Sequence, residues 1–142
     1  MDPKEWFENM ALQKGWESIY ARRDFANTIE VVQWLEDELE SFQNNETVLV
    51  IDPIARSNDP SQSVSAINYS GSIMILTVSD LDDTYEGKWE KFIQPLLGIV
   101  HGEMEQALRC VFDVGNWNSI EVINQFDRNA DGLSIRYNLK GY

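Results

Sequence analysis

The sequence predicts an α+β domain. A small mixed or antiparallel sheet of about four strands carries a long helix on one face, with N-terminal helices beside it. Three observations lead to this fold class. Apolar residues run almost without interruption over 73–78, as in a strand that is covered on both faces. Apolar residues then recur at three- and four-residue steps over 85–110, as in an amphipathic helix. Polar and apolar residues alternate over 133–140, which is typical of a half-buried strand.

The length of 142 residues fits a single domain, with N-terminal helices over 1–43 and the sheet and long helix over 44–142. The single cysteine, Cys110, excludes an intramolecular disulfide and fits a reducing compartment, and we expect it to be a small core residue. The sequence shows neither an 18-residue apolar run nor a basic-then-apolar leader. We therefore expect a protein made in a cytoplasm, with no membrane partner.

The first helix has clear start and stop signals. Asp2 is placed as its N-cap, Pro3 as its first residue and Gly15 as its end. Its inward residues are expected to be Trp6, Phe7 and Met10. A second helix is expected from Asp24 or Asn27 to the break at Asn44, with apolar residues at Ile29, Val32, Leu35, Leu39 and Phe42.

The remaining segments predict two hairpins around the long helix. A short strand over 47–51 is followed by a polar surface loop over 55–65, and the chain returns through 67–78 as an extended hairpin. After the helix, a turn over 115–118 leads into a closing hairpin, in which Ile120 and Val122 should point inward. The hairpin turn lies over 126–132, where Gly132 is expected to supply a positive φ.

The long helix should provide most of the core. Its apolar stripe comprises Trp89, Phe92, Ile93, Leu96, Leu97, Val100, Met104, Ala107, Leu108 and Val111. His101 and Cys110 are the only residues of their kinds, and on a regular helix they would face opposite sides. No catalytic residue is nominated from them, and no metal cluster has suitable spacing.

The formal net charge of −13 excludes a basic nucleic-acid-binding surface, because contacts with phosphates dominate affinity for DNA and RNA. Acidic residues outnumber basic residues in both halves of the chain. Such a surface suits a channel through which DNA passes without specific binding, or a DNA mimic that binds a basic partner. It also serves solubility alone.

Two acidic motifs suggest chemistry. Asp80, Asp82 and Thr84 match the D-x-D-x-T motif of haloacid-dehalogenase-like phosphatases, in which Asp80 would be the nucleophile and Asp82 the acid/base. The strands that should carry the other residues of that active site are missing, and capping of the following helix explains the same side chains. We therefore expect no enzyme activity and no cofactor.

The second acidic motif covers residues 127–132 and resembles the start of an EF-hand loop. The twelfth position is Asn138 instead of glutamate, and the flanking residues resemble strands. A polar hairpin turn explains the pattern better.

The order helix, strand, long loop, strand, long helix and closing hairpin over 29–140 resembles the tail terminator (tail-completion) proteins of long-tailed phages and related head–tail neck proteins. The nearest likeness is the acidic turn over 126–132, followed by the alternating strand up to Tyr137. This resemblance implies a small α+β structural subunit of the virion. It would form a hexamer or larger ring, bind other neck or tail proteins, and join the tail to the capsid.

Subunit contacts are expected in the polar loop, at Arg56, Asn58, Asp59, Ser61 and Gln62. An alternative from another class is an acidic inhibitor or immunity protein that presents Glu36, Asp37, Glu38 and Glu40 to a basic enzyme. A solvated helix face accounts for the same run of acids. The two functions differ in oligomeric state, since a terminator forms rings whereas an inhibitor usually binds its partner one to one.

Overall fold

The computed structural model describes residues 2–21, 46–58, 66–78, 85–125 and 130–141. It is an α+β structure with one six-stranded sheet. Its elements are α1 (Pro3–Lys14), β1 (Glu17–Tyr20), β2 (Thr47–Ile51), β3 (Ala55–Asn58), β4 (Ile67–Val78), a long helix over 85–109, β5 (Asp113–Gln125) and β6 (Ala130–Gly141). The long helix consists of α3 (Tyr85–Lys88), the π-helical η1 (Trp89–Ile93), α4 (Gln94–Gly98), the π-helical η2 (Ile99–Met104) and α5 (Glu105–Arg109).

The sheet is mixed, with strand order β1-β2-β4-β6-β5. Among the described strands only β1 and β2 pair in parallel. The pairs β2–β4, β4–β6 and β6–β5 are antiparallel. β3 pairs with the first part of β4, and β2 pairs with the last part. The predicted pairing of 47–51 with 67–78 is confirmed. The strand count of about four is too low, because β1 and β3 are too short for an alternation pattern to reveal them.

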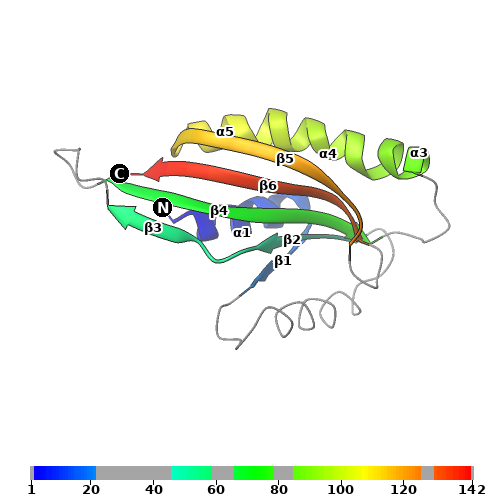
Figure 1. Ribbon diagram of the computed structural model, residues 1–142, viewed down its shortest axis with the longest axis horizontal. Helices are drawn as coiled ribbons and strands as arrows, with labels where there is room; N and C mark the ends of the chain where they lie inside the picture. The colour runs from blue at the N-terminus through cyan, green and yellow to red at the C-terminus, as the bar shows by residue number, and fades with distance from the viewer. Residues whose placement is uncertain (1, 22–45, 59–65, 79–84, 126–129, 142) are drawn as a thin grey trace.

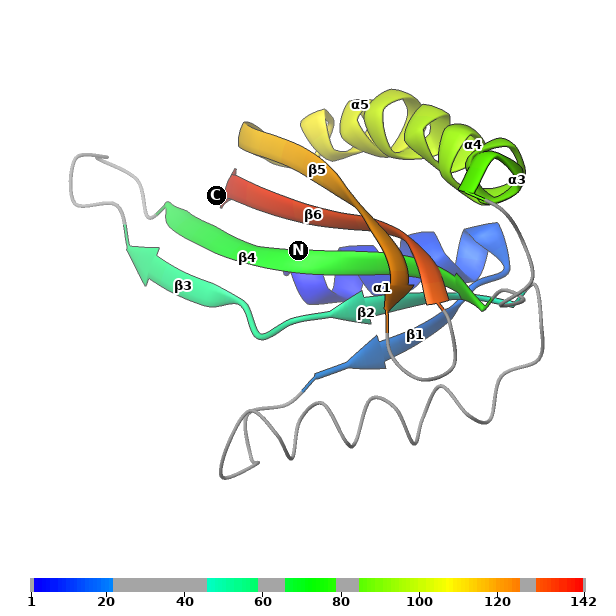
Figure 2. The same cartoon turned by 45° about the vertical axis from the view of Figure 1, so that its right-hand side comes forward.

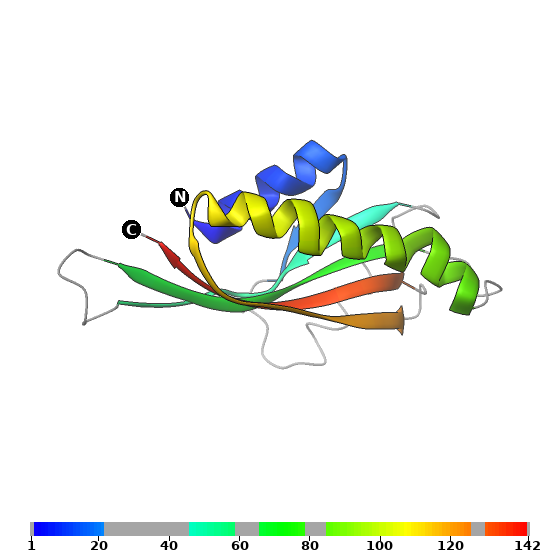
Figure 3. The same cartoon turned by 90° about the horizontal axis from the view of Figure 1, so that it is seen from above.

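Both described helices cover the same face of the sheet (Figure 3). They share one core, in which Phe7, Ile93 and Met104 meet Ile73, Ile75 and Ile135 of the sheet. A smaller apolar cluster lies on the opposite face and contains Val48, Val50, Leu76, Ala130 and Ala21. The prediction that both faces of the 73–78 strand are covered is therefore confirmed at Ile75 and Leu76, which are both fully buried.

The first helix begins and ends as predicted. The Asp2 carboxylate accepts a hydrogen bond from the Lys4 backbone N–H at 2.9 Å, and Pro3 occupies the first turn. Gly15 ends the helix in the left-handed conformation, with φ of 74°. The aromatic side chains dock as expected, since the Phe7 ring lies 5.2 Å from the Tyr137 ring and 6.4 Å from the Trp117 ring. The expected second helix lies outside the described residues.

The long helix buries residues at a constant spacing of four: Leu96, Val100, Met104, Leu108 and then Phe112. In a regular α-helix, residues four apart differ by about 40° in direction around the helix axis. A stripe with this spacing would therefore rotate gradually away from the sheet. The wider turns of η2, which contains Val100 and Met104, offset this drift. The sheet contacts η2 directly, because the Trp117 indole N–H of β5 donates a hydrogen bond to the Val100 carbonyl of η2 at 3.0 Å.

Three predictions about this core are wrong. Val111 is 46% exposed and Ile120 is 69% exposed, whereas both were expected to face inward. Cys110 is also exposed. Ile120 faces outward because Ser119 and Glu121, its neighbours in β5, bond to the long helix, and alternate strand residues point to opposite faces.

One predicted turn, and the described last residues of another, belong to strands. Residues 115–118 belong to β5, where Gly115 marks a bulge between Val114 and Asn116. Gly132 lies inside β6, and in the described chain only Gly15 has a positive φ. Glycine is required at 132 for another reason: a Cβ there would lie 1.8 Å from the Ile75 carbonyl oxygen of β4.

The two leucines of the long helix provide a test of its orientation. Leu108 is fully buried, whereas Leu97 is only half-buried at the edge of the core. Leu108→Ala should lower the free energy of unfolding by about 2–5 kcal/mol. Leu97→Ala should cost clearly less, because its side chain already contacts solvent. Urea denaturation of both variants measures the difference, and equal losses would contradict this orientation.

Candidate functional site

Two of the predicted contact residues, Arg56 and Asn58, lie where β3 pairs with β4, at the end of the sheet that extends past both helices (Figure 2). Arg56 and Asn58 are exposed residues of β3. The first part of the predicted 55–65 loop is therefore a strand, held by four residue pairs with β4. Asp59, Ser61 and Gln62 lie outside the described residues. We call this end of the sheet, residues 55–58 and 67–70, the β3–β4 end.

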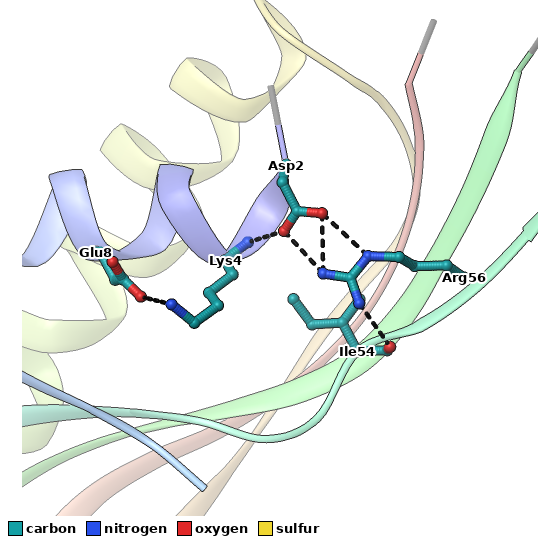
Figure 4. A network of polar contacts seen from close by, with 5 residues as sticks. All are labelled: Asp2, Lys4, Glu8, Ile54 and Arg56. Atoms are coloured by element: carbon teal, nitrogen blue, oxygen red, sulfur yellow. Dashed lines mark hydrogen bonds and ion pairs between the residues drawn. The ribbon is translucent and has the colours of Figure 1, made fainter. Parts of the chain in front are cut away.

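Arg56 is already bound within the chain (Figure 4). Its Nη2 donates to both oxygens of the Asp2 carboxylate at 2.9 Å, and its Nε donates to Oδ2 at 3.0 Å. Its Nη1 donates to the Ile54 carbonyl at 3.3 Å. Asp2 thus caps α1 and binds β3 with the same carboxylate. The ion pair fixes the β3–β4 end against the helix layer.

Lys4, in the first turn of α1, has two further contacts. Its ammonium group forms an ion pair with Glu8, one helical turn along α1. It also lies 5.1 Å from the centre of the Tyr20 ring, within the range of a cation–π contact. The N-terminal part of α1 is therefore held to both β1 and β3.

A buried ion pair lies at the other end of the sheet. Lys88 Nζ of the long helix is 3.2 Å from Asp131 Oδ2 of β6, and the two side chains are 2% and 0% exposed. Asp131 belongs to the segment that resembles an EF-hand loop. Its carboxylate is used inside the fold, and Asn138, at the twelfth position, is an exposed strand residue. Over the described residues 130–138 the chain is a β-strand, whereas the last part of an EF-hand loop leads into a helix.

The remaining residues that the sequence suggested for catalysis, metal binding or contact with a basic enzyme do not form a site within the described residues. Asp80 and Asp82 of the phosphatase motif lie outside the described residues, as do Glu36, Asp37, Glu38 and Glu40. Within the described ranges, no group of three or more His, Cys, Asp or Glu side chains is arranged to hold a metal ion. His101 contacts Ser119 Oγ through Nε2 at 2.6 Å on the exposed surface.

A pocket that no sequence pattern predicted lies between the long helix, the α1–β1 turn and the ends of β2 and β4. Its volume is about 280 Å³, close to the lower end of typical ligand pockets. Thr47 and Thr77 contribute hydroxyls that lie 2.9 Å apart. Its lining residues are Trp16, Thr47, Thr77, Lys91, Phe92, Pro95, Leu96 and Ile99.

The face of the sheet opposite the helices is polar beyond the small apolar cluster. Strand registry places alternate residues of β4, β5 and β6 on this face. We call the exposed part the outer sheet face, and its residues include Ser70, Asp113, Asn116, Asn118, Ile120, Arg136 and Asn138. Ile120 differs from the others because it is apolar.

Tyr137 of β6 pairs with Gly71 of β4, next to the β3–β4 end, and its side chain belongs to the core under the helices. Its side chain is 3% exposed, and its hydroxyl has no hydrogen-bond partner among the described residues. Burial raises the pKa of this hydroxyl well above its ordinary value. Gly71 leaves room for it, since a Cβ at residue 71 would lie 2.9 Å from the Tyr137 oxygen.

Comparison of the chain with protein-family models, with curated proteins and with solved structures finds no match. In the described part of the chain, no helix has the length and apolar character needed to cross a membrane.

The double role of Asp2 is testable. Asp2→Ala removes both the helix cap and the partner of Arg56, whereas Arg56→Ala removes only the ion pair. The ion pair is about two-fifths exposed on both sides and should contribute less than about 1 kcal/mol. Loss of the cap adds about 0.5–2 kcal/mol. Urea unfolding should therefore show the larger loss for Asp2→Ala, and the reverse order would contradict the capping role.

The buried ion pair should show strong coupling. Lys88→Met leaves Asp131 charged and buried without this partner, which costs about 3–5 kcal/mol in comparable pairs. Asp131→Leu likewise leaves the buried Lys88 ammonium group without this partner. The double variant Lys88→Met/Asp131→Leu should lose less stability than the sum of the two single variants. Additive losses in urea unfolding would mean that the two groups do not act as a pair.

Proposed function

We propose that this chain is a structural subunit of the phage head–tail interface, a tail terminator or neck ring protein that joins the tail to the capsid. The observation that carries the proposal is the β3–β4 end. All four β3 residues are exposed, and this end of the sheet extends past both helices (Figure 1). A chain that keeps its core under the helices and extends a braced pair of strands beyond them is suited to assembly with neighbours.

The arrangement of elements also supports the proposal. The resemblance implies the order helix, strand, long loop, strand, long helix and closing hairpin over 29–140. The described chain has β2, β4, the long helix and the β5–β6 hairpin in that order, and the helix of the pattern lies outside the described residues. The net charge of −13 suits a ring whose lumen lets DNA pass without specific binding. We assign no catalytic step and no cofactor to the protein. It would be made in the host cytoplasm and become part of the virion.

The two edge strands of the sheet are poorly suited to unspecific pairing with strands of other chains. β1, at one edge, has only four residues. β5, at the other edge, is interrupted by irregular register at Val114/Asn116 and at Val122/Gln125. Short and bulged edge strands resist unspecific pairing with other chains. Contacts between subunits would then use side chains and the β3–β4 end.

The proposal predicts a defect in particle assembly. Deleting the gene from the phage that carries it should yield separate filled heads and separate tails, and expressing the intact gene in trans should restore joined particles. Mass spectrometry should find the protein in purified wild-type virions. Normal joined particles without the gene would refute the proposal. A strict monomer that is absent from virions and binds a basic enzyme tightly would support the inhibitor alternative.

A further inference from the structure

The pocket beside the long helix combines apolar walls with a few polar groups. Its apolar and aromatic lining residues are Trp16, Phe92, Pro95, Leu96 and Ile99, and its polar ones are Thr47, Thr77 and Lys91. Binding sites for small molecules usually have this composition, in which apolar walls hold the body of the ligand and polar groups fix its orientation.

Regular elements hold the walls of the pocket in place. Trp16 follows the left-handed Gly15 at the end of α1, and its backbone N–H donates to the Ala11 carbonyl at 2.8 Å. Thr47 and Thr77 are cross-strand partners in the β2–β4 pair. The other lining residues lie on successive turns of the long helix. The pocket is therefore formed by the fold itself.

The size of the pocket suits an aromatic molecule. Its volume is about 280 Å³, whereas a cavity of about 150 Å³ lined by aliphatic and aromatic side chains accepts benzene. The pocket thus has room for two fused rings, or for one ring with a short side chain. The Trp16 and Phe92 side chains are half-buried. A planar ligand that packs on them would remove apolar surface from water on both sides of the contact.

The two threonine hydroxyls define the polar end of the ligand. Thr77 is 8% exposed, and its Oγ lies 2.9 Å from the Thr47 Oγ, so one hydroxyl donates to the other. The accepting hydroxyl keeps its own proton, and both oxygens keep lone pairs. The pair can therefore donate one hydrogen bond to a ligand and accept another. A hydroxyl or carboxamide group on the ligand matches both capacities.

The charges around the pocket do not call for a charged ligand. Lys91 is the ionisable residue among those that line it, and Glu46 directly precedes Thr47 in the chain. Each of these two side chains already interacts with another residue of the chain. Moving a charged group from water into a mostly apolar pocket costs free energy. An uncharged ligand is therefore favoured.

We propose that this pocket binds a small uncharged aromatic molecule that carries one hydroxyl or carboxamide group. The ring packs on Trp16 and Phe92, and the polar group bonds to the Thr47–Thr77 pair. The inference goes beyond the proposed assembly and does not rest on it, because a ring of subunits does not require an occupied pocket. Either proposal can fail without the other.

Three probes that share an indole ring and a two-carbon side chain test the preference for an uncharged ligand. They are indole-3-ethanol, which is uncharged, tryptamine, which is a cation, and indole-3-acetate, which is an anion. Two-dimensional amide NMR spectra of the full chain should show saturable shifts at Trp16, Thr47, Thr77 and Phe92 with indole-3-ethanol. The two charged probes should bind at least about tenfold more weakly. Unmoved pocket signals, or a charged probe that binds as tightly, would overturn the inference.

Variants test the position of the ligand. Thr77→Val keeps the shape of the side chain without its hydroxyl, so it should weaken binding of indole-3-ethanol by about three- to tenfold. Binding of 3-methylindole, which lacks the polar group, should not weaken. Ile99→Trp should fill the pocket and abolish binding of both probes. Val111→Trp is the matched control, because it adds the same side chain at an exposed apolar residue outside the pocket and should bind like the wild type.

The same spectra report whether each variant is folded. Unchanged affinity for indole-3-ethanol in a folded Ile99→Trp or Thr77→Val variant would contradict the assigned site. If Ile99→Trp does not fold, the comparison between Thr77→Val and the wild type decides.

Discussion

The structure depends on the central position of β4, which forms hydrogen-bonded pairs with three strands. Along one side it pairs with β3 and then β2, and along the other with β6 over its whole length of 12 residues. Its last residues are buried on both faces, so the helices and the smaller apolar cluster both pack on it. The close approach of Ile75 to Gly132 fixes the β4–β6 register, because any side chain at residue 132 would collide with the β4 backbone.

The helix layer has to follow this sheet over the full length of residues 85–109. Apolar residues at a constant spacing of four would leave the sheet if every turn were α-helical. The π-helical stretch η2 keeps Leu96, Val100, Met104 and Leu108 in contact with it. Lys88 and Asp131 connect the start of the helix to β6, and the Asp2–Arg56 pair connects α1 to β3 (Figure 4). The β3–β4 end is therefore held in place by contacts that lie outside the main core.

Sequence patterns predicted the elements that are determined by residues close together in the sequence. Asp2, Pro3 and Gly15 mark the bounds of α1, and the apolar run at 73–78 marks β4, because caps and periodicity depend on neighbouring residues. Short strands gave no such signal, and the face on which Ile120 lies depends on contacts of its neighbours with the helix. The role of Gly132 depends on a strand more than 50 residues away. The pocket was not predictable, since its lining residues come from four separate segments.

The chain places its main core under two helices, and we propose that its remaining surfaces serve assembly. Imaging by electron cryomicroscopy tests this most directly, with the purified protein examined alone at high concentration and after addition to purified tails. We expect closed rings, free or seated on one end of the tail tube. Dispersed monomers in both samples, with bare tail ends, would contradict this proposal.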